Sequence, residues 1–343
     1  MGNPEFHLIK KQRRTVQITL PDGRIIEGLR SANLAKFLNI LPEWKNPPIV
    51  GAIVNNELRE LSYLVQKDVE VTPLSMASSD GSKIYRRSLI FLLQATFEHL
   101  FPQKSIIIDH SIPSGGYFCE VKNGDQLTHK ELQKIEKKMR DLVKADLPIE
   151  RQVVPLDEAV ALFKRKGDID KVRLLKYRQK KYLVLYRLKD HRDYHHGYMV
   201  PSSGYLEFFK LIWMDSKSFI LQYPRRRSPM MLEKIPENQQ LMATFRQYGS
   251  WLKRLGVDNV GGLNDAIEEK RIREIILVSE AFHEMRIADI ARRISSDTRR
   301  IRIVLIAGPS SSGKTTFSKR LSVQLLAQGI TPFPLEMDNY FVD

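Results

Sequence analysis

The chain has 343 residues, of which 42% are apolar, and Lys and Arg outnumber Asp and Glu by 55 to 40. This length favours two or three domains, and no run reaches the roughly 18 consecutive apolar residues of a membrane helix. The single cysteine, Cys119, excludes an internal disulfide, so we expect a cytoplasmic protein with no membrane partner. The net charge of +15 favours an anionic partner such as nucleotide or RNA, although a solvated basic surface is the alternative.

Residues 13–75 follow a leader at 1–12 whose opening, MGNPEF, resembles a cloning scar. Apolar and polar residues alternate on both sides of PDG at 21–23, which predicts a hairpin. Ser31 is a candidate N-cap for a short helix over SANLAKFLNIL, and further strand patterns follow. This order predicts a small β-grasp domain, and the polar stretch SMASSDGS at 75–82 predicts its boundary.

The segment 83–224 mixes helical and strand patterns. SLIFLLQATFEHLF and HKELQKIEKKMRDLVKA repeat apolar residues at helical spacing, and a third helix over PLDEAVALFKRKGD ends at Gly167. KYLVLYRL, GYLEFFKLIWM and SFILQY are typical of strands, which together predict an α+β domain. Residues 225–300 are mostly helical, with Asn264 or Asp265 as a helix start, and we interpret them as a helical linker.

Residues 301–343 begin a different pattern. IRIVLIA at 301–307 is typical of a parallel strand that is buried on both faces. GPSSSGKT then matches G-x-x-x-x-G-K-[ST], and a helix pattern runs on to Gly329. This order predicts the N-terminal part of a P-loop domain, with its first βαβ unit, so the whole chain is expected to be a multidomain α+β protein.

The loop motif predicts a site for ATP and Mg²⁺. Its glycines allow a tight turn whose N–H groups face phosphate oxygens, and the positive end of the next helix adds attraction. Lys314 is the expected catalytic contact to the phosphates, and Thr315 is the expected Mg²⁺ ligand. A serine-rich turn is the alternative. The expected nucleotide-binding residues are Gly308, Pro309, Ser310, Ser311, Ser312, Gly313, Lys314, Thr315 and Thr316.

Asp338 follows a second strand pattern, TPFPLEM at 331–337. In a right-handed βαβ unit the end of the second strand lies near the loop after the first strand. The Asp338 carboxylate would then orient and deprotonate an acceptor hydroxyl, as a second catalytic residue. A turn or helix-capping aspartate is the alternative.

GPSSSGKTTFSKRLS followed by LEMDNYFVD resembles the start of the uridine kinase and phosphoribulokinase family. The resemblance implies a nucleoside kinase that transfers phosphate from ATP to the 5′-hydroxyl of a uridine-like substrate, with Asp338 as its catalytic aspartate. The sequence stops early in such a kinase domain, so we expect this chain by itself to be catalytically inactive.

The front of the chain resembles a different enzyme. Residues 13–75 are similar to TGS domains, the β-grasp modules of threonyl-tRNA synthetase. SLIFLLQATFEHLFP, SGGYFCEV and DYHHGYMVPSSGYLEFFKL make 83–224 resemble the second additional domain of that synthetase, which carries editing. In this order the parts resemble a bacterial family of TGS-containing uridine kinases.

The residues of the editing chemistry are missing from this resemblance. The family pattern has H-x-x-x-H on the first helix and C-x-x-x-H near a later glycine, where this chain has Arg87, Phe91, His195 and Met199. One position in four keeps a side chain able to serve as a ligand. Hydrolysis of mischarged tRNA is therefore not expected, whereas a binding cleft can persist.

Three nearby histidines, His191, His195 and His196, raise the question of a metal site. Their spacing fits no standard zinc motif, and a solvated loop is the alternative.

The stretch from Lys171 to Arg192 holds nine Lys or Arg residues together with Tyr177, Tyr182 and Tyr186. Basic groups bind phosphates and tyrosines stack on unpaired bases, so this stretch predicts RNA contact, which the triplet at 225–227 extends if the fold brings it near. A solvated sheet face is the alternative. The alternative function is therefore a tRNA- or nucleotide-sensing binding protein in which the kinase is only an output module. A third hypothesis is a GTPase regulator with an N-terminal TGS domain.

Overall fold

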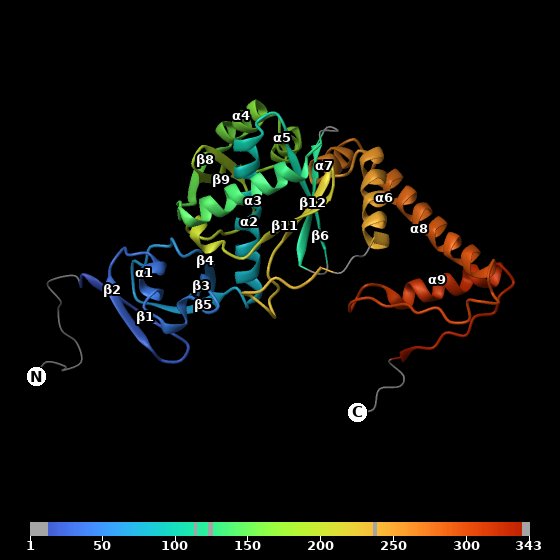
Figure 1. Ribbon diagram of the computed structural model, residues 1–343, viewed down its shortest axis with the longest axis horizontal. Coiled ribbons are helices and arrows are strands. Elements are labelled where there is room, and N and C mark those ends of the chain that lie inside the picture. Colours follow the sequence, from blue (N-terminus) through green and yellow to red (C-terminus); the bar gives the residue numbers. More distant parts are fainter. Residues whose placement is uncertain (1–12, 113–114, 123–125, 236–238, 338–343) are drawn as a thin grey trace, which may run out of the picture. The chain divides into compact units, whose positions relative to one another are not determined.

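The computed structural model describes residues 13–112, 115–122, 126–235 and 239–337, and Figure 1 labels their helices and strands. The chain divides into two compact units: unit 1 comprises residues 1–166 and 179–240, and unit 2 comprises residues 167–178 and 241–343. Several sheets and many helices confirm the predicted multidomain α+β class. Within the described residues, no helix is long and apolar enough to cross a membrane.

Residues 13–75 form a five-stranded sheet of order β2-β1-β5-β3-β4, in which β1 and β5 run parallel. The predicted hairpin is confirmed, with Gly23 in the left-handed region at φ +85°. The predicted cap Ser31 is wrong, because Ser31 lies in a turn and Asn33 caps the helix by accepting the Lys36 N–H. The elements are β1 (Thr15–Thr19), β2 (Ile25–Leu29), α1 (Leu34–Leu38), η1 (Pro42–Trp44), β3 (Ile49–Val54), β4 (Glu57–Arg59) and β5 (Val69–Ser75).

The predicted boundary at 75–82 is the start of a helix rather than a linker. Helix α2 (Ser79–Leu100) begins directly after β5, and the Ser78 side chain caps it by accepting the Gly81 N–H. A Cβ on Gly81 would lie 2.0 Å from the Ser75 carbonyl oxygen. Glycine at this position therefore allows the strand to turn at once into the helix.

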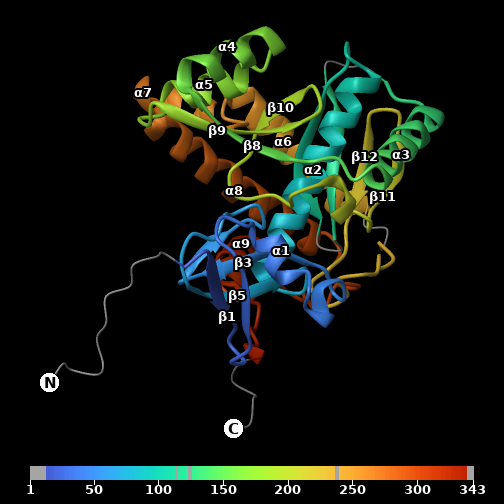
Figure 2. The same ribbon diagram turned by 90° about the vertical axis from the view of Figure 1, so that its left-hand side faces the viewer.

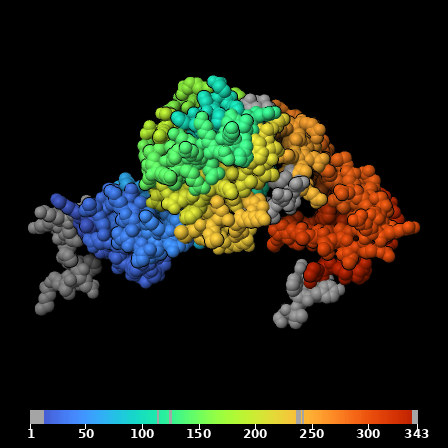
Figure 3. All heavy atoms as spheres, viewed as in Figure 1, coloured from blue at the N-terminus to red at the C-terminus, as the bar shows by residue number. Residues whose placement is uncertain are grey.

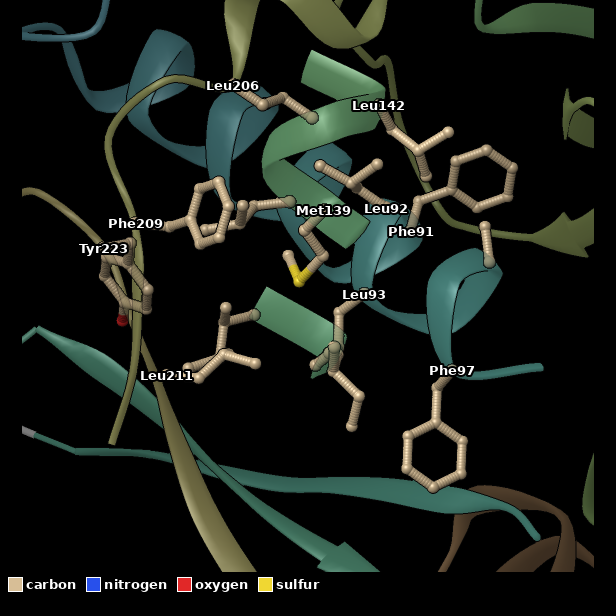
Figure 4. Packing of buried hydrophobic residues seen from close by; sticks show 14 of the residues in the cluster. Phe91, Leu92, Leu93, Phe97, Met139, Leu142, Leu206, Phe209, Leu211 and Tyr223 are labelled. Carbon is tan, nitrogen blue, oxygen red and sulfur yellow. The ribbon is translucent and has the colours of Figure 1, made fainter. Parts of the chain in front are cut away.

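Helices α2 and α3 (His129–Lys144) pack on a four-stranded antiparallel sheet of order β11-β12-β7-β6. Strand β12 is buried along its whole length. Figure 4 shows Met139 of α3 among Leu92 and Leu93 of α2 and Phe209. The strands are β6 (Ile106–Ile112), β7 (Gly116–Val121), β11 (Lys210–Asp215) and β12 (Ser218–Gln222).

A three-stranded antiparallel sheet of order β10-β9-β8 completes unit 1, with α4 beside β8 and β9 (Figure 2). The predicted stop at Gly167 is confirmed, because α4 ends at Lys166 and Gly167 has φ +74°. The elements are β8 (Glu150–Pro155), α4 (Leu156–Lys166), β9 (Tyr182–Leu188), β10 (His191–Tyr194) and the short turn η3 (Ser203–Tyr205).

Unit 2 is helical. Its helices are α5 (Ile169–Lys176), α6 (Gln239–Leu255), α7 (Val260–Glu268), α8 (Ile272–Ser295) and α9 (Lys314–Ala327). The predicted helix start at Asn264 or Asp265 is wrong, because both residues lie inside α7, which Asn259 caps. Helix α9 packs against α8 through buried Ile287, Ala291 and Leu321.

The predicted strands of the βαβ unit are absent from the described residues: 301–307 and 331–337 form no strand. Ile303 and Leu305 are 79% and 89% exposed. Figure 3 shows the C-terminal part of the described chain, to which the segment 301–307 belongs, in orange to red. An extended segment becomes a strand only when a neighbour accepts its backbone hydrogen bonds. No described strand pairs with this segment, so its apolar residues have no sheet to enter.

Candidate nucleic-acid interface

A cavity of about 660 Å³ lies in unit 1 and is lined by four arginines: Arg86, Arg225, Arg226 and Arg227. It forms where the end of β12 leads into Tyr223 and an arginine-rich turn. The Tyr223 N–H donates to the carbonyl oxygen of Gly115, the residue before β7, at 3.2 Å. The first turns of α2 supply Ser82 and Arg86 as the opposite wall. Segments far apart in the sequence therefore meet at one positive site.

Tyr223 positions Arg86 within the cavity wall. The Arg86 Nη1 donates to the Tyr223 hydroxyl at 3.3 Å, and its guanidinium lies 5.2 Å from the centre of the Tyr223 ring. Tyr223 is buried, and Figure 4 shows it beside Phe209 at the apolar cluster. A buried ring that supports a guanidinium by cation–π contact fixes the charge in place.

Glu233 neutralises part of this charge. Arg227 binds it through two hydrogen bonds, Nε to Oε1 at 2.8 Å and Nη2 to Oε2 at 2.5 Å. The Arg225 Nη1 lies 3.7 Å from Oε2. The Arg227 hydrogen bonds lower the pKa of the Glu233 carboxyl to about 2, so the carboxylate stays charged.

Arg86 and Arg226 keep their charges uncompensated. Among the described residues, no carboxylate lies within ion-pair distance of either guanidinium. Arg226 is exposed, and its Nε reaches the Ala77 carbonyl oxygen at 3.4 Å. The cavity therefore combines four arginines with one carboxylate partner and has room for an anion.

The residues of the predicted RNA contact from Lys171 to Arg192 are divided between the two units: those up to 178 belong to unit 2 and those from 179 to unit 1. Within unit 2, Arg173 pairs with Asp265 at 2.6 Å, and Lys176 pairs with Glu268 at 2.5 Å. The Tyr177 hydroxyl donates to Asp265 at 2.6 Å. These side chains, on α5 and at its C-terminal end, therefore connect α5 to α7.

Part of the stretch that lies in unit 1 also makes internal contacts. Arg187 pairs with Glu150 at 2.6 Å, and Arg192 pairs with Glu158 at 2.8 Å. Tyr186 is fully buried and donates to Glu60 at 3.1 Å, so it cannot stack on a base. RNA contact at this stretch stays a prediction, and at these paired side chains it requires a phosphate to replace a carboxylate partner.

The four positions of the lost editing chemistry are packed rather than open. Phe91 and Met199 are buried, and the Phe91 ring contacts the ring of His195 edge-on, with centroids 5.6 Å apart. Arg87 donates to the Tyr198 carbonyl oxygen at 2.5 Å, and burial lowers its pKa. The predicted persistent cleft is therefore filled at Phe91 and Met199.

The histidines of this region do not form a metal site within the described residues, where no group of three or more His, Cys, Asp or Glu side chains is arranged to hold an ion. His191 is buried, and its Nδ1 lies 2.5 Å from Glu98 Oε2. His196 is exposed. The three residues thus occupy different environments rather than converging on one point.

The phosphate-loop motif forms a tight turn before α9. Ser312 N–H donates to the Pro309 carbonyl oxygen at 3.3 Å, and Gly313 adopts φ +82° as the residue before the helix. The Lys314 Nζ donates to the Pro309 carbonyl oxygen at 3.0 Å. The loop and helix agree with the prediction, whereas the buried strand before them is missing. Asp338 lies outside the described residues.

No protein-family model matches the chain. The chain is similar to threonine–tRNA ligases, with 35% identity over 213 residues for that of Laribacter hongkongensis (60% of this chain, 34% of the ligase). For the ligase of Coxiella burnetii the identity is 30% over 195 residues (57% of this chain, 30% of the ligase). For that of Aromatoleum aromaticum it is 27% over 275 residues (78% and 39%). The chain spans about a third of the length of the curated relatives it matches.

These relatives support the resemblance of the front region to the TGS and editing domains of threonyl-tRNA synthetase. They contradict the predicted uridine kinase function and the predicted nucleoside kinase enzyme, because they are aminoacyl-tRNA synthetases rather than kinases. A nucleoside substrate likewise has no support. The kinase prediction was wrong because the loop motif identifies a phosphate grip but not an acceptor, and LEMDNYFVD was too short to supply one.

Sequence reasoning missed Arg86 and Glu233. The arginine triplet at 225–227 was visible as a charge run, and a buried strand ending in Tyr223 directly before it was a usable signal. The sequence could not place Arg86 beside that triplet, since α2 precedes it by more than 100 residues, whereas Glu233 follows Arg227 by only six residues and was a candidate partner.

Proposed function

We propose that this chain binds tRNA through unit 1, with the arginine cavity as the main contact. The observation that carries the proposal is the arrangement of four arginines around one cavity, with a single carboxylate partner among the described residues. Guanidinium groups bind phosphate oxygens in a bidentate manner, and phosphate contacts supply most of the affinity of basic proteins for nucleic acids. The net charge of +15 and the names of the relatives support the same partner.

Each predicted domain has a role in the proposed tRNA binding. Residues 13–75 would act as a TGS-like β-grasp domain, and 83–224 as an editing-like domain without hydrolytic chemistry. The loss of the ligand pattern at Phe91 and Met199 leaves binding as the role of the second domain. The helical linker that we predicted from residue 225 would begin later, because residues up to 240 belong to unit 1.

Binding of a tRNA transcript, measured by fluorescence anisotropy, tests this proposal. We expect Arg226→Gln to weaken binding by about five- to tenfold, since the variant cannot make a charge-assisted hydrogen bond to phosphate. Lys137→Gln is the matched control, because it removes the same charge from an exposed position on α3. Equal losses of affinity in the two variants, or no binding by the unaltered chain, would contradict the proposal.

We propose separately that residues 308–316 bind the phosphates of ATP. The tight turn closed by Ser312 and the left-handed Gly313 support the fit, as does the start of α9 with its positive helix end. Lys314 would exchange its Pro309 contact for a phosphate oxygen. Thr315 would hold Mg²⁺ through its hydroxyl, and the ion would neutralise charge between phosphates.

Calorimetry with ATP and Mg²⁺ tests this second site. We expect weak binding by the unaltered chain, because the exposed segment 301–307 provides no strand to fix the loop. Lys314→Ala should abolish it, and Lys319→Ala, one turn further along α9, should leave it unchanged. Indistinguishable titrations of the chain and of Lys314→Ala would rule the site out.

A further inference from the structure

We infer that Glu233 acts as an internal competitor in the arginine cavity, and that the phosphate group of an unpaired nucleotide replaces its carboxylate. The inference rests on the proposed tRNA binding and names the chemical group that enters the cavity. It concerns the residues of unit 1 alone.

The contacts of Glu233 are those that a phosphate would make. Its two oxygens accept from Arg227 at 2.8 and 2.5 Å, and the second oxygen faces Arg225 at 3.7 Å. Ser228 adds a hydroxyl donor to Oε1 at 3.0 Å. Carboxylate and phosphate oxygens fit the same guanidinium fork, so a bound phosphate needs no new geometry.

The charge of the cavity favours a phosphate over the carboxylate that it holds. Glu233 supplies one negative charge, and a phosphodiester within RNA supplies the same, whereas the terminal phosphate of AMP supplies about −1.5 to −2. Arg86 and Arg226 line the same cavity without a carboxylate partner among the described residues. A dianion can therefore gain contacts to these two arginines that Glu233 does not make.

The size and lining of the cavity indicate which parts of a nucleotide besides the phosphate it can hold. At about 660 Å³ it falls within the range of sites for small organic ligands, roughly 300–1,000 Å³. Ser82 and Ser111 line it beside the arginines and provide hydroxyl groups for polar atoms of a sugar. The Tyr223 ring is buried and supports Arg86, so base stacking on it is excluded. Recognition therefore centres on the phosphate of a single nucleotide.

Glu233 can leave without unfolding its surroundings. The Gln222 side-chain amide donates to the Glu233 backbone carbonyl, which holds the backbone independently of the carboxylate. The Arg227 side chain is 68% exposed and is free to follow an incoming anion. Rotation of one side chain is thus sufficient for the exchange.

Titrations with AMP and with adenosine test the inference, because the two ligands differ by the phosphate alone. Both titrations use protein that carries Lys314→Ala, because this substitution removes the phosphate contact of the loop at 308–316. We expect Glu233→Gln to raise AMP affinity about tenfold, because it removes the carboxylate that competes for Arg227. We expect Arg226→Gln to lower AMP affinity about tenfold, because it removes one charged hydrogen bond to the phosphate. Adenosine should respond to neither substitution, and Lys137→Gln should leave AMP affinity unchanged.

Equal AMP affinity in the Lys314→Ala chain and its Glu233→Gln derivative would overturn the inference. Arg226→Gln gives an independent answer if Glu233→Gln disturbs the turn, because Arg226 has no carboxylate partner among the described residues. Arg226→Gln and Glu233→Gln are also measured with a tRNA transcript, to separate the inference from the proposed function.

The expected AMP pattern without any tRNA binding would support phosphate binding in the cavity and refute the proposed function. Binding of tRNA that ignores both substitutions, with AMP also unaffected, would refute the cavity and place RNA elsewhere.

Discussion

Arg87 and Gly197 fit together because Gly197 has no side chain. Gly197 adopts φ +103°, and a Cβ built on it would lie 2.7 Å from the Arg87 guanidinium carbon. The guanidinium in turn donates to the Tyr198 carbonyl oxygen. Arg87 stands at a position where the editing pattern that this region resembles has a histidine. Its guanidinium is held against the loop that follows β10. Arg87 and Phe91 thus make packing contacts at positions where the editing pattern that this region resembles has histidines.

Gly197→Ala should lower the free energy of unfolding by about 1–3 kcal/mol, through the strained backbone and the clash with Arg87. Gly23→Ala isolates the backbone cost, since Gly23 has φ +85° and a Cβ added to it would meet no atom within 4 Å. Urea denaturation of unit 1, followed by circular dichroism, measures both. A destabilisation by Gly197→Ala no larger than that by Gly23→Ala would show that the Arg87 contact is not tight.

At the scale of elements, Glu98 ties α2 to the three-stranded sheet and α4. Its carboxylate lies 2.5 Å from His191 Nδ1 on β10 and 3.0 Å from Lys166 Nζ at the end of α4. Partial burial raises the pKa of Glu98, but the hydrogen bonds and charges of His191 and Lys166 outweigh it and lower that pKa to about 2. Three elements therefore meet at one carboxylate.

This pKa predicts a stability change at acid pH. A carboxyl whose folded pKa is lowered stabilises the fold above its unfolded value, near 4.3–4.5, and loses that contribution as the pH falls toward 2. Thermal unfolding of the unaltered chain should therefore show Tm falling more steeply between pH 4.5 and pH 2 than in Glu98→Gln. Parallel Tm profiles would mean that the ionised form of Glu98 gains nothing from its partners. Solvent reduces the effect, because the Glu98 side chain is half exposed.

Local signals in the sequence predicted many elements, and the failures have physical causes. The turn at 21–23 and the stop at Gly167 were predictable because left-handed backbone requires glycine or a few other residues. The α7–α8 division was missed, since its break at Lys270, with φ +62°, has no glycine or proline. The strand predicted at 301–307 failed because a buried strand depends on neighbours that no local pattern supplies.

At the scale of the whole molecule, the candidate site could be predicted only in part. The charge of +15 and the triplet at 225–227 indicated an anionic partner, but the cavity also needs Arg86 and Ser111 from distant segments. The longer basic stretch raises a further difficulty, since a sequence does not reveal pairing: Asp265 and Glu268 of α7 pair with Arg173 and Lys176 of α5. Clusters of like charge are thus interpretable only once their carboxylate partners are known.

The salt dependence of tRNA binding shows whether RNA phosphates enter the arginine cavity. The measurement is the dissociation constant of a tRNA transcript between about 50 and 200 mM salt, for the unaltered chain, for Arg86→Gln with Arg226→Gln, and for Lys134→Gln with Lys137→Gln. The account predicts that the slope of log affinity against log salt becomes shallower by roughly 0.7 for each phosphate that the cavity variant no longer binds, with no comparable change in the control. Identical slopes for the cavity variant and the unaltered chain would show that RNA phosphates do not enter the arginine cavity, and would contradict the account.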